Sequence, residues 1–240
     1  MLEDSRLGRS VDTEKARGLV IELAEQVISN PDALIWLTHL RTRDEYTATH
    51  CINVCILALT FGRALDLEED KLQRLGMGAL LHDIGKMRVP DDILNKPARL
   101  TKEEFEIMKG HAKIGADALK VAEDQLGTNS FLRLARVIAL THHEKWDGSG
   151  YPAGLRGDEI PVSGRLMAVA DVYDALITKR VYKPAFSHAK AMDIIREGRG
   201  CHFDPDIIDA LDAIENQFIE IADKFSDELY DERPKKVSLG

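Results

Sequence analysis

Apolar residues recur at steps of three and four along most of the chain, which is the spacing of helices that bury one face. This pattern predicts helices over residues 12–29, 44–64, 101–115, 131–141, 161–182, 187–197 and 206–222. A further helix is predicted between the break at residues 66–69 and His82. No segment of the sequence has the alternation of a strand, and no internal repeat or low-complexity region stands out. The sequence therefore predicts an all-α fold.

One helix start is specified in detail. Thr101 and Glu104 have the spacing of a capping box, and Leu100 and Phe105 have that of a hydrophobic staple. Three turns further along, His111 falls on the apolar face of the same segment. We therefore expect this helix to deliver His111 to the protein interior.

The composition narrows the class of protein. A chain of 240 residues with 44% hydrophobic and 30% charged residues is typical of a globular protein with one main domain. The net charge of -9 disfavours binding of bulk nucleic acid but is compatible with a small anionic ligand held by local cations. No apolar run is long enough to span a membrane and the N-terminus lacks a signal-peptide core, so we expect a cytoplasmic location. Three cysteines argue against a disulfide framework, and we interpret Cys51 and Cys55 as small buried hydrophobes.

The candidate chemistry begins at His82-Asp83. Leu72, Leu75 and Ala79 fall at helical spacing with His82, so its imidazole should point inward with an acid beside it. A buried ionised carboxylate is destabilising by several kcal/mol unless it is paired or holds a metal. A metal site is the first hypothesis, and the alternative for this pair alone is a hydrogen-bonded core histidine next to a helix-terminal aspartate.

Other predicted helices carry further histidines and one more acid at inward positions. They are His50, His111, the adjacent His142 and His143, and Asp171, which ends an apolar run. Adjacent residues on a helix diverge by about 100°, so two consecutive histidines suit two neighbouring metal ions. Five histidines and two acids without a thiolate favour a dinuclear site over one tetrahedral zinc or five independent core histidines. Three histidines fall outside this pattern and are interpreted as surface or supporting residues, namely His39, His188 and His202.

A glycine-rich turn and two cations accompany this set. In the segment 146–152, Gly150 can bring backbone close to a ligand while Tyr151 offers a ring and a hydroxyl. Asp174 follows Asp171 by three residues, and Arg180 and Lys183 add positive charge where the predicted helix ends. In addition, Asn53 lies one turn beyond His50 and is placed to orient it.

These residues together resemble the HD-GYP family of bacterial cyclic dinucleotide phosphodiesterases, a subgroup of the HD-domain metallohydrolases. The motifs that carry the resemblance are His82 to Lys86, His142 to Glu144, Asp147 to Pro152, and Asp171 to Leu176 with Arg180 and Lys183. The resemblance spans about residues 40–210 and implies an HD-domain helical bundle with a dinuclear metal centre. The chain would then comprise an N-terminal helical or linker segment (1–38), a catalytic domain (39–228) and a polar tail (229–240).

The resemblance also implies an activity, namely hydrolysis of cyclic di-GMP to the linear dinucleotide or to GMP, with two divalent ions, iron or manganese. Two ions bridged by one carboxylate lower the pKa of a shared water from near 16 to about 7, which supplies hydroxide for attack on phosphorus. Asp83 is the implied bridge, and Lys86 the implied phosphate contact. The implied metal ligands are His50, His82, Asp83, His111, His142, His143 and Asp171. The candidate substrate contacts are Lys86, Gly150, Tyr151, Asp174, Arg180 and Lys183.

The sequence departs from the family pattern at two positions. Some members carry a glutamate four residues before the first histidine and use it to hold a third metal, whereas this chain has Tyr46 there. Glu45 would point about 100° away, so we expect two metals. The usual proline after the third histidine is Ala112, which removes no ligand.

Two alternatives remain open from the sequence. One is a catalytically weak cyclic dinucleotide sensor or partner-binding module, and the other is a phosphodiesterase for the mixed cyclic GMP-AMP dinucleotide. A regulatory sensor domain or a diguanylate cyclase are candidate partners, and the N-terminal helix is a candidate dimerisation element.

Overall fold

The computed structural model describes residues 45–126, 132–178 and 185–231. Their helices are α3 (Glu45–Ala64), α4 (Glu69–Leu81), η1 (Ile84–Arg88), α5 (Asp91–Leu94), α6 (Lys102–Leu126), α7 (Leu132–Thr141), η2 (Gly157–Glu159), α8 (Val162–Ile177), α9 (His188–Glu197), α10 (Pro205–Ala213) and α11 (Glu215–Asp231). Within these ranges the only β pairing is an isolated bridge between Arg199 and Phe203. The predicted all-α fold is therefore confirmed for the part of the chain that the structure describes.

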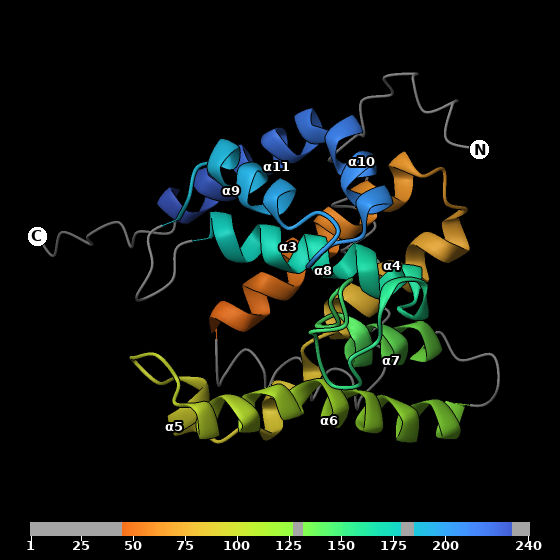
Figure 1. The fold of residues 1–240 in the computed structure, drawn as a ribbon, viewed down its shortest axis with the longest axis vertical. Coiled ribbons are helices and arrows are strands. Elements are labelled where there is room, and N and C mark those ends of the chain that lie inside the picture. Colours follow the sequence, from red (N-terminus) through yellow and green to blue (C-terminus); the bar gives the residue numbers. More distant parts are fainter. Residues whose placement is uncertain (1–44, 127–131, 179–184, 232–240) are drawn as a thin grey trace, which may run out of the picture.

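The helices pack around a central pair, α3 and α8. In Figure 1, α6 runs along one side of the molecule and α9, α10 and α11 lie on the opposite side, with α3 and α8 between them. Helices α4 and α7 connect the two sides, since α4 packs on α3 and α7 while α7 packs on α6 and α8. The site described below lies where α3, α6, α7, α8 and the segment after α4 meet.

One continuous hydrophobic cluster holds these elements together. Phe61 of α3, Tyr173 of α8 and Phe218 of α11 form an aromatic contact with ring centroids 4.9–5.1 Å apart, from Phe218 to each of the other two. Edge-on aromatic pairs add about 0.5–1.5 kcal/mol beyond the area they bury. This contact fixes α8, which carries Asp171, against α3, which carries His50.

The predicted capping box is confirmed. The backbone N–H of Glu104 donates to Thr101 Oγ1 at 3.2 Å, and the backbone N–H of Thr101 donates to the Glu104 carboxylate at 2.7 Å. Lys96 pairs with the same carboxylate at 2.6 Å. The N-terminal end of α6 is therefore fixed by Glu104 of its first turn and by two residues that precede the helix, Thr101 and Lys96.

Three predicted helices differ from the structure in their bounds. The helix expected over 101–115 continues to Leu126. The helix expected to reach residue 182 ends at Ile177, because Thr178 has an extended backbone and its hydroxyl donates to Asp174 Oδ1 at 3.0 Å. The segment 206–222 contains two helices, α10 and α11, which separate at Ile214. The sequence does not indicate this break, because the apolar spacing continues through it and no glycine or proline marks it.

Some expectations fall on residues that the structure does not describe. They include the helix over 12–29, His39, Arg180, Lys183 and the last nine residues, 232–240. Helix α11 itself continues to Asp231, beyond the expected domain end at residue 228. None of the described helices is long and apolar enough to cross a membrane.

Candidate metal centre

Asp83 lies at the centre of the predicted ligands. Its Oδ1 is 3.2 Å from His111 Nε2 and 3.8 Å from His142 Nε2. Its Oδ2 is 3.4 Å from His82 Nε2 and 3.9 Å from His50 Nε2. The two oxygens of one carboxylate therefore face two different pairs of histidines, which come from four separate elements.

These contacts define two groups with metal-ligand spacing that share Asp83. One group contains Asp83, His111, His142 and His143, and the other contains His50, His82 and Asp83. Asp171 lies between the groups, with its carboxylate 3.0 Å from His50 Nε2 and 3.9 Å from His143 Nδ1. The structure thus brings all seven predicted ligands together, and each of the two groups that share Asp83 could hold a metal ion.

In four of the histidines a contact at Nδ1 fixes the ring. In three rings Nδ1 faces a backbone carbonyl of the preceding turn, and in the fourth it faces a carboxylate: His82 with Ala79 (2.7 Å), His111 with Met108 (2.6 Å), His142 with Ala139 (3.0 Å) and His50 with Asp174 (2.6 Å). A ring that donates from Nδ1 keeps an acceptor lone pair on Nε2. This is the way proteins orient histidines that bind metals.

Two buried atoms at the centre of the cluster support this interpretation. His82 Nε2 and Asp83 Oδ1 have no hydrogen-bond partner among the described residues, although solvent does not reach them. An unsatisfied buried polar atom is destabilising by about 1–3 kcal/mol. A divalent cation would satisfy both atoms, so the residues present fit a metal pair.

The charges of the cluster are strongly coupled. Burial alone would lower the pKa of His50, but its contacts with Asp171 and Asp174 outweigh burial and raise that pKa to about 9. Burial alone would raise the pKa of Asp83, but Lys86 and His82 hold it well below its usual range. Burial lowers the pKa of His142, and it lowers that of His143 to about 3, so both rings are neutral and able to bind a cation.

Lys86 is oriented by the same carboxylate. Its ammonium donates to Asp83 Oδ2 at 2.5 Å from one turn further along, in η1. Burial alone would lower the pKa of Lys86, but the negative charge of Asp83 raises it, so the side chain keeps its positive charge. The structure therefore places the Lys86 ammonium directly beside Asp83.

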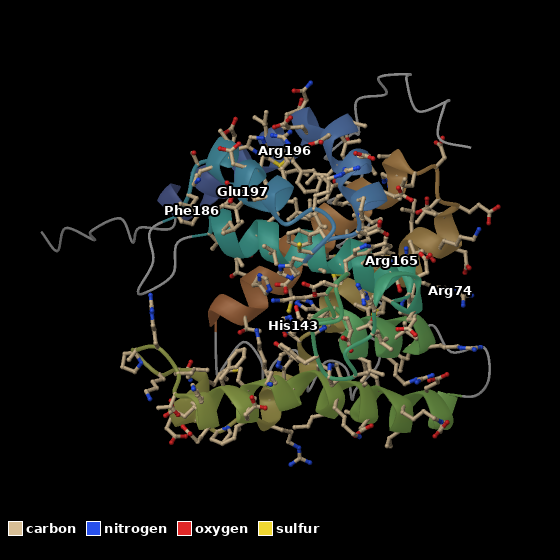
Figure 2. All side chains as sticks on the ribbon, viewed as in Figure 1. Arg74, His143, Arg165, Phe186, Arg196 and Glu197 are labelled. Carbon is tan, nitrogen blue, oxygen red and sulfur yellow. The ribbon has the colours of Figure 1, made fainter. Side chains whose placement is uncertain are left out.

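Solvent reaches the cluster from one side. The side chains of His50, His82, Asp83, His111 and His142 are at most 2% exposed, whereas those of His143, Lys86 and Asp171 are 26%, 20% and 13% exposed. Figure 2 shows His143 in the region between α6 and the central helices α3 and α8. The cluster is therefore accessible to solvent at these three residues.

The glycine-rich loop after α7 borders this open side. Tyr151 N donates to His143 O at 3.1 Å, and the Tyr151 ring lies 4.7 Å from the His143 ring. A Cβ atom at Gly150 would lie 2.3 Å from Lys145 N, so only glycine allows this close approach of two backbone segments. Gly150 and Tyr151 thus lie beside the cluster, as expected for the loop.

Glu144 holds the loop in place, a role that the sequence analysis did not assign. Its carboxylate is buried and accepts from Ala153 N at 2.7 Å and from Leu155 N at 3.0 Å. A signal was present in the sequence, because an acid directly after two inward histidines needs a partner. The backbone of the segment before α10 adds two bonds, from Trp146 N to His202 O and from Asp147 N to Cys201 O.

Asp174 has a different environment from the one expected for a substrate contact. It is fully buried, and its carboxylate accepts from Asn53 Nδ2 at 2.9 Å, from Thr178 Oγ1 and from the His50 ring. Asn53 therefore supports His50 through Asp174 rather than directly. These contacts place Asp174 as a support for His50, and its expected contact with substrate stays a prediction.

The sequence analysis also interpreted several residues that lie outside the cluster. Cys51 and Cys55 are buried, and Cys55 Sγ donates to Gly76 O at 3.3 Å, which fits small buried hydrophobes. His188 contacts the Tyr173 hydroxyl and Glu215 on the far side of α8. Arg180 and Lys183 lie outside the described residues, so their expected roles stay predictions.

Known proteins with similar sequences agree with this site. The family model for the HD domain matches residues 23–207. A cyclic di-GMP phosphodiesterase of Vibrio cholerae is 61% identical over 156 residues, which are 65% of this chain and 32% of that protein. The cyclic di-GMP phosphodiesterase PA4108 of Pseudomonas aeruginosa is 41% identical over 210 residues, 88% of this chain and 49% of that protein. A 3'3'-cGAMP-specific phosphodiesterase of Vibrio cholerae is 37% identical over 182 residues, 76% of this chain and 34% of that protein.

The solved structures include Bd1817, an HDG"Y"P protein from Bdellovibrio bacteriovorus, with a TM-score of 0.56 and 23% identity over 90% of this chain and 65% of that one. The chain thus belongs to the HD-domain family. Its motifs and relatives place it in the HD-GYP group of that family, which confirms the resemblance. The chain spans 32–49% of the length of the three curated relatives described above.

Proposed function

We propose that the chain is the catalytic part of a phosphodiesterase that hydrolyses cyclic di-GMP to the linear dinucleotide or to GMP. The observation that carries the proposal is the single carboxylate, Asp83, shared by two histidine groups that open to solvent beside Lys86, His143 and Asp171. The names of the relatives described above support the same substrate class.

The metal ligands in this proposal are His50, His82, Asp83, His111, His142, His143 and Asp171, with two iron or manganese ions. Divalent ions held there would supply hydroxide at neutral pH and Lewis acidity toward the phosphate. The open edge of the cluster admits the phosphodiester, and Asp83 orients Lys86 toward it. The charged ammonium of Lys86 then stabilises the negative charge that develops on the phosphoryl oxygens.

Tyr151, held against His143, forms one wall of the entrance to the site. Burial raises the pKa of Tyr151, so its hydroxyl stays neutral and can donate a hydrogen bond to the substrate. Arg180 and Lys183 are proposed as further substrate contacts from the resemblance, as are a regulatory sensor domain or a diguanylate cyclase as partners.

The direct test is to load the protein anaerobically with Fe(II) or Mn(II), count the bound ions and follow hydrolysis of cyclic di-GMP by chromatography. We expect two ions per chain and turnover to the linear product or GMP. Asp83→Ala should abolish both metal binding and hydrolysis, because it removes the shared ligand. Asp117→Ala, which changes an exposed aspartate paired with Lys113, should leave both unchanged. Full turnover by Asp83→Ala would contradict the proposal.

A second candidate substrate is the mixed cyclic GMP-AMP dinucleotide, because a relative specific for 3'3'-cGAMP also matches the chain. The same experiment with both substrates decides between them by the ratio of kcat/KM. Tight binding of either dinucleotide by the metal-loaded protein without any turnover would favour a sensor instead.

A further inference from the structure

The open side of the metal centre continues into an aromatic surface that reaches α6. The Tyr151 ring lies against His143, and the Phe105 ring of α6 lies edge-on to Tyr151 with centroids 6.3 Å apart. Phe105 is 46% exposed although it is a large apolar side chain. An exposed aromatic ring next to the entrance of a site is available to stack on a planar ligand.

Lys109 lies over the same surface. Its ammonium is 5.7 Å from the centroid of Phe105 and also 5.7 Å from that of Tyr151. The side chain is 27% exposed and pairs with Glu106, so it is held in place rather than extended into solvent. A lysine ammonium has three donors, so it can contact a ligand while it keeps this ion pair.

Helix α6 makes this surface rigid relative to the metals. The same helix carries the ligand His111, and its start is fixed by the capping box and by Lys96. Phe105 and Lys109 are therefore placed at a constant distance from the cluster. Their spacing of one turn puts both on the side of α6 that faces Tyr151.

We propose that Phe105, Lys109 and Tyr151 form an aromatic subsite that binds one guanine base of the substrate. This inference rests on the proposed function and names two residues, Phe105 and Lys109, that determine how the substrate is recognised. The base stacks on the exposed ring of Phe105, and Lys109 donates to O6 or N7 of guanine. Guanine fits this donor better than adenine, because guanine offers two acceptors on that edge while adenine pairs one acceptor with a donor.

The contacts also allow a purely structural role, in which Lys109 and Phe105 only stabilise the first turns of α6. The two roles differ in what they change. A structural role affects the melting temperature of the protein, whereas the aromatic subsite affects KM and ligand affinity with little effect on kcat.

The test uses the full chain loaded with Mn(II) and cyclic di-GMP as substrate. Phe105→Ala should raise KM about tenfold, the effect of removing one base–aromatic stack, with kcat within about twofold and unchanged metal content. Phe105→Leu keeps an apolar side chain but removes the ring, so it should raise KM as much as Phe105→Ala does. Phe105→Trp keeps an aromatic ring and should have the KM of the wild type. Ile107→Ala changes a side chain on α6 with a similar exposure of 48% and should have no effect on KM.

A second readout does not depend on turnover. Calorimetric titration of the metal-free protein with GMP and with AMP should show tighter binding of GMP, and Lys109→Met should remove that preference. If the wild type hydrolyses cyclic di-GMP but the Phe105 variants keep its KM and Lys109→Met keeps the preference, the aromatic subsite is wrong and the proposed function stands. If the wild type neither binds nor hydrolyses the dinucleotide, both proposals are wrong.

Discussion

His50 differs from the other buried histidines in the group that fixes its ring. Three rings face backbone carbonyls, but His50 Nδ1 faces the buried carboxylate of Asp174. A carboxylate raises the basicity of the opposite nitrogen more than a carbonyl does, and so strengthens it as a ligand. We therefore expect Asp174 to act on the candidate metal site through His50.

We expect Asp174→Asn to lower metal affinity by about 10–100-fold, the usual effect of removing such a supporting carboxylate. The amide oxygen can still accept from His50, so the fold should persist. Competition with a chelator, followed by metal analysis, measures the change, and Asp117→Asn is the exposed control. Unchanged affinity in Asp174→Asn would mean that the carboxylate charge does not matter for the ligand.

Glu144 gives a second prediction at the level of one side chain. Glu144→Ala leaves the backbone N–H groups of Ala153 and Leu155 without their acceptor, and we expect a loss of about 2–4 kcal/mol in the free energy of unfolding. Glu144→Gln keeps one acceptor oxygen and should lose less. Urea unfolding measures both variants, with the exposed Glu197→Ala on α9 as the control. Equal stability of Glu144→Ala and the wild type would rule out this role for the carboxylate.

The contact between η1 and α6 sets the distance between the site residues that these two helices carry. Asp83 directly precedes η1, Lys86 lies in η1, and His111 lies in α6. Gly85 allows the two backbones to touch, because a Cβ atom there would lie 1.9 Å from His111 O and 2.6 Å from Gly115 N. Backbone atoms cannot move aside as a flexible side chain can.

Gly85→Ala should therefore separate η1 from α6, destabilise the protein by about 3 kcal/mol or more and weaken metal binding. Gly110→Ala is the matched change on α6, since its Cβ would meet only Ile114 Cδ1 at 3.7 Å. This control should be stabilising by about 0.5–1 kcal/mol, because alanine favours a helix interior. Thermal unfolding with metal analysis distinguishes the two, and similar behaviour of both variants would contradict the argument.

At the scale of the whole molecule, the sequence predicts which residues meet but not how their supports are arranged. Helical spacing was sufficient to turn His50, His82 and His111 inward, because one buried face per helix determines these directions. The same spacing could not reveal that Asp174 faces His50, since that contact depends on how α8 packs on α3. Phe105 was interpreted only through the local staple pattern, and its contact with Tyr151 joins two elements far apart in the sequence.

Metal binding and stability of the whole molecule are linked through the proton on His50. In the metal-free protein the pKa of His50 is about 9, above the ordinary value of 6.5, because Asp171 and Asp174 outweigh burial. A raised pKa in the folded state stabilises the fold fully below about pH 6.5, and this contribution is lost as the pH rises through about 9. The metal-free protein should therefore lose stability over this range, as measured by thermal unfolding.

A bound cation needs the neutral ring, so metal loading at pH 7 must displace the proton from His50. Calorimetry of Mn(II) binding in two buffers with different ionisation enthalpies should then report proton release at pH 7 and much less at pH 10. Metal affinity should rise with pH up to about 9 for the same reason. Asp174→Asn lowers the pKa of His50 by removing one neighbouring negative charge, so it should reduce the release at pH 8. Binding heats that are independent of the buffer at pH 7 would contradict this coupling, because His50 would then already be neutral in the metal-free protein.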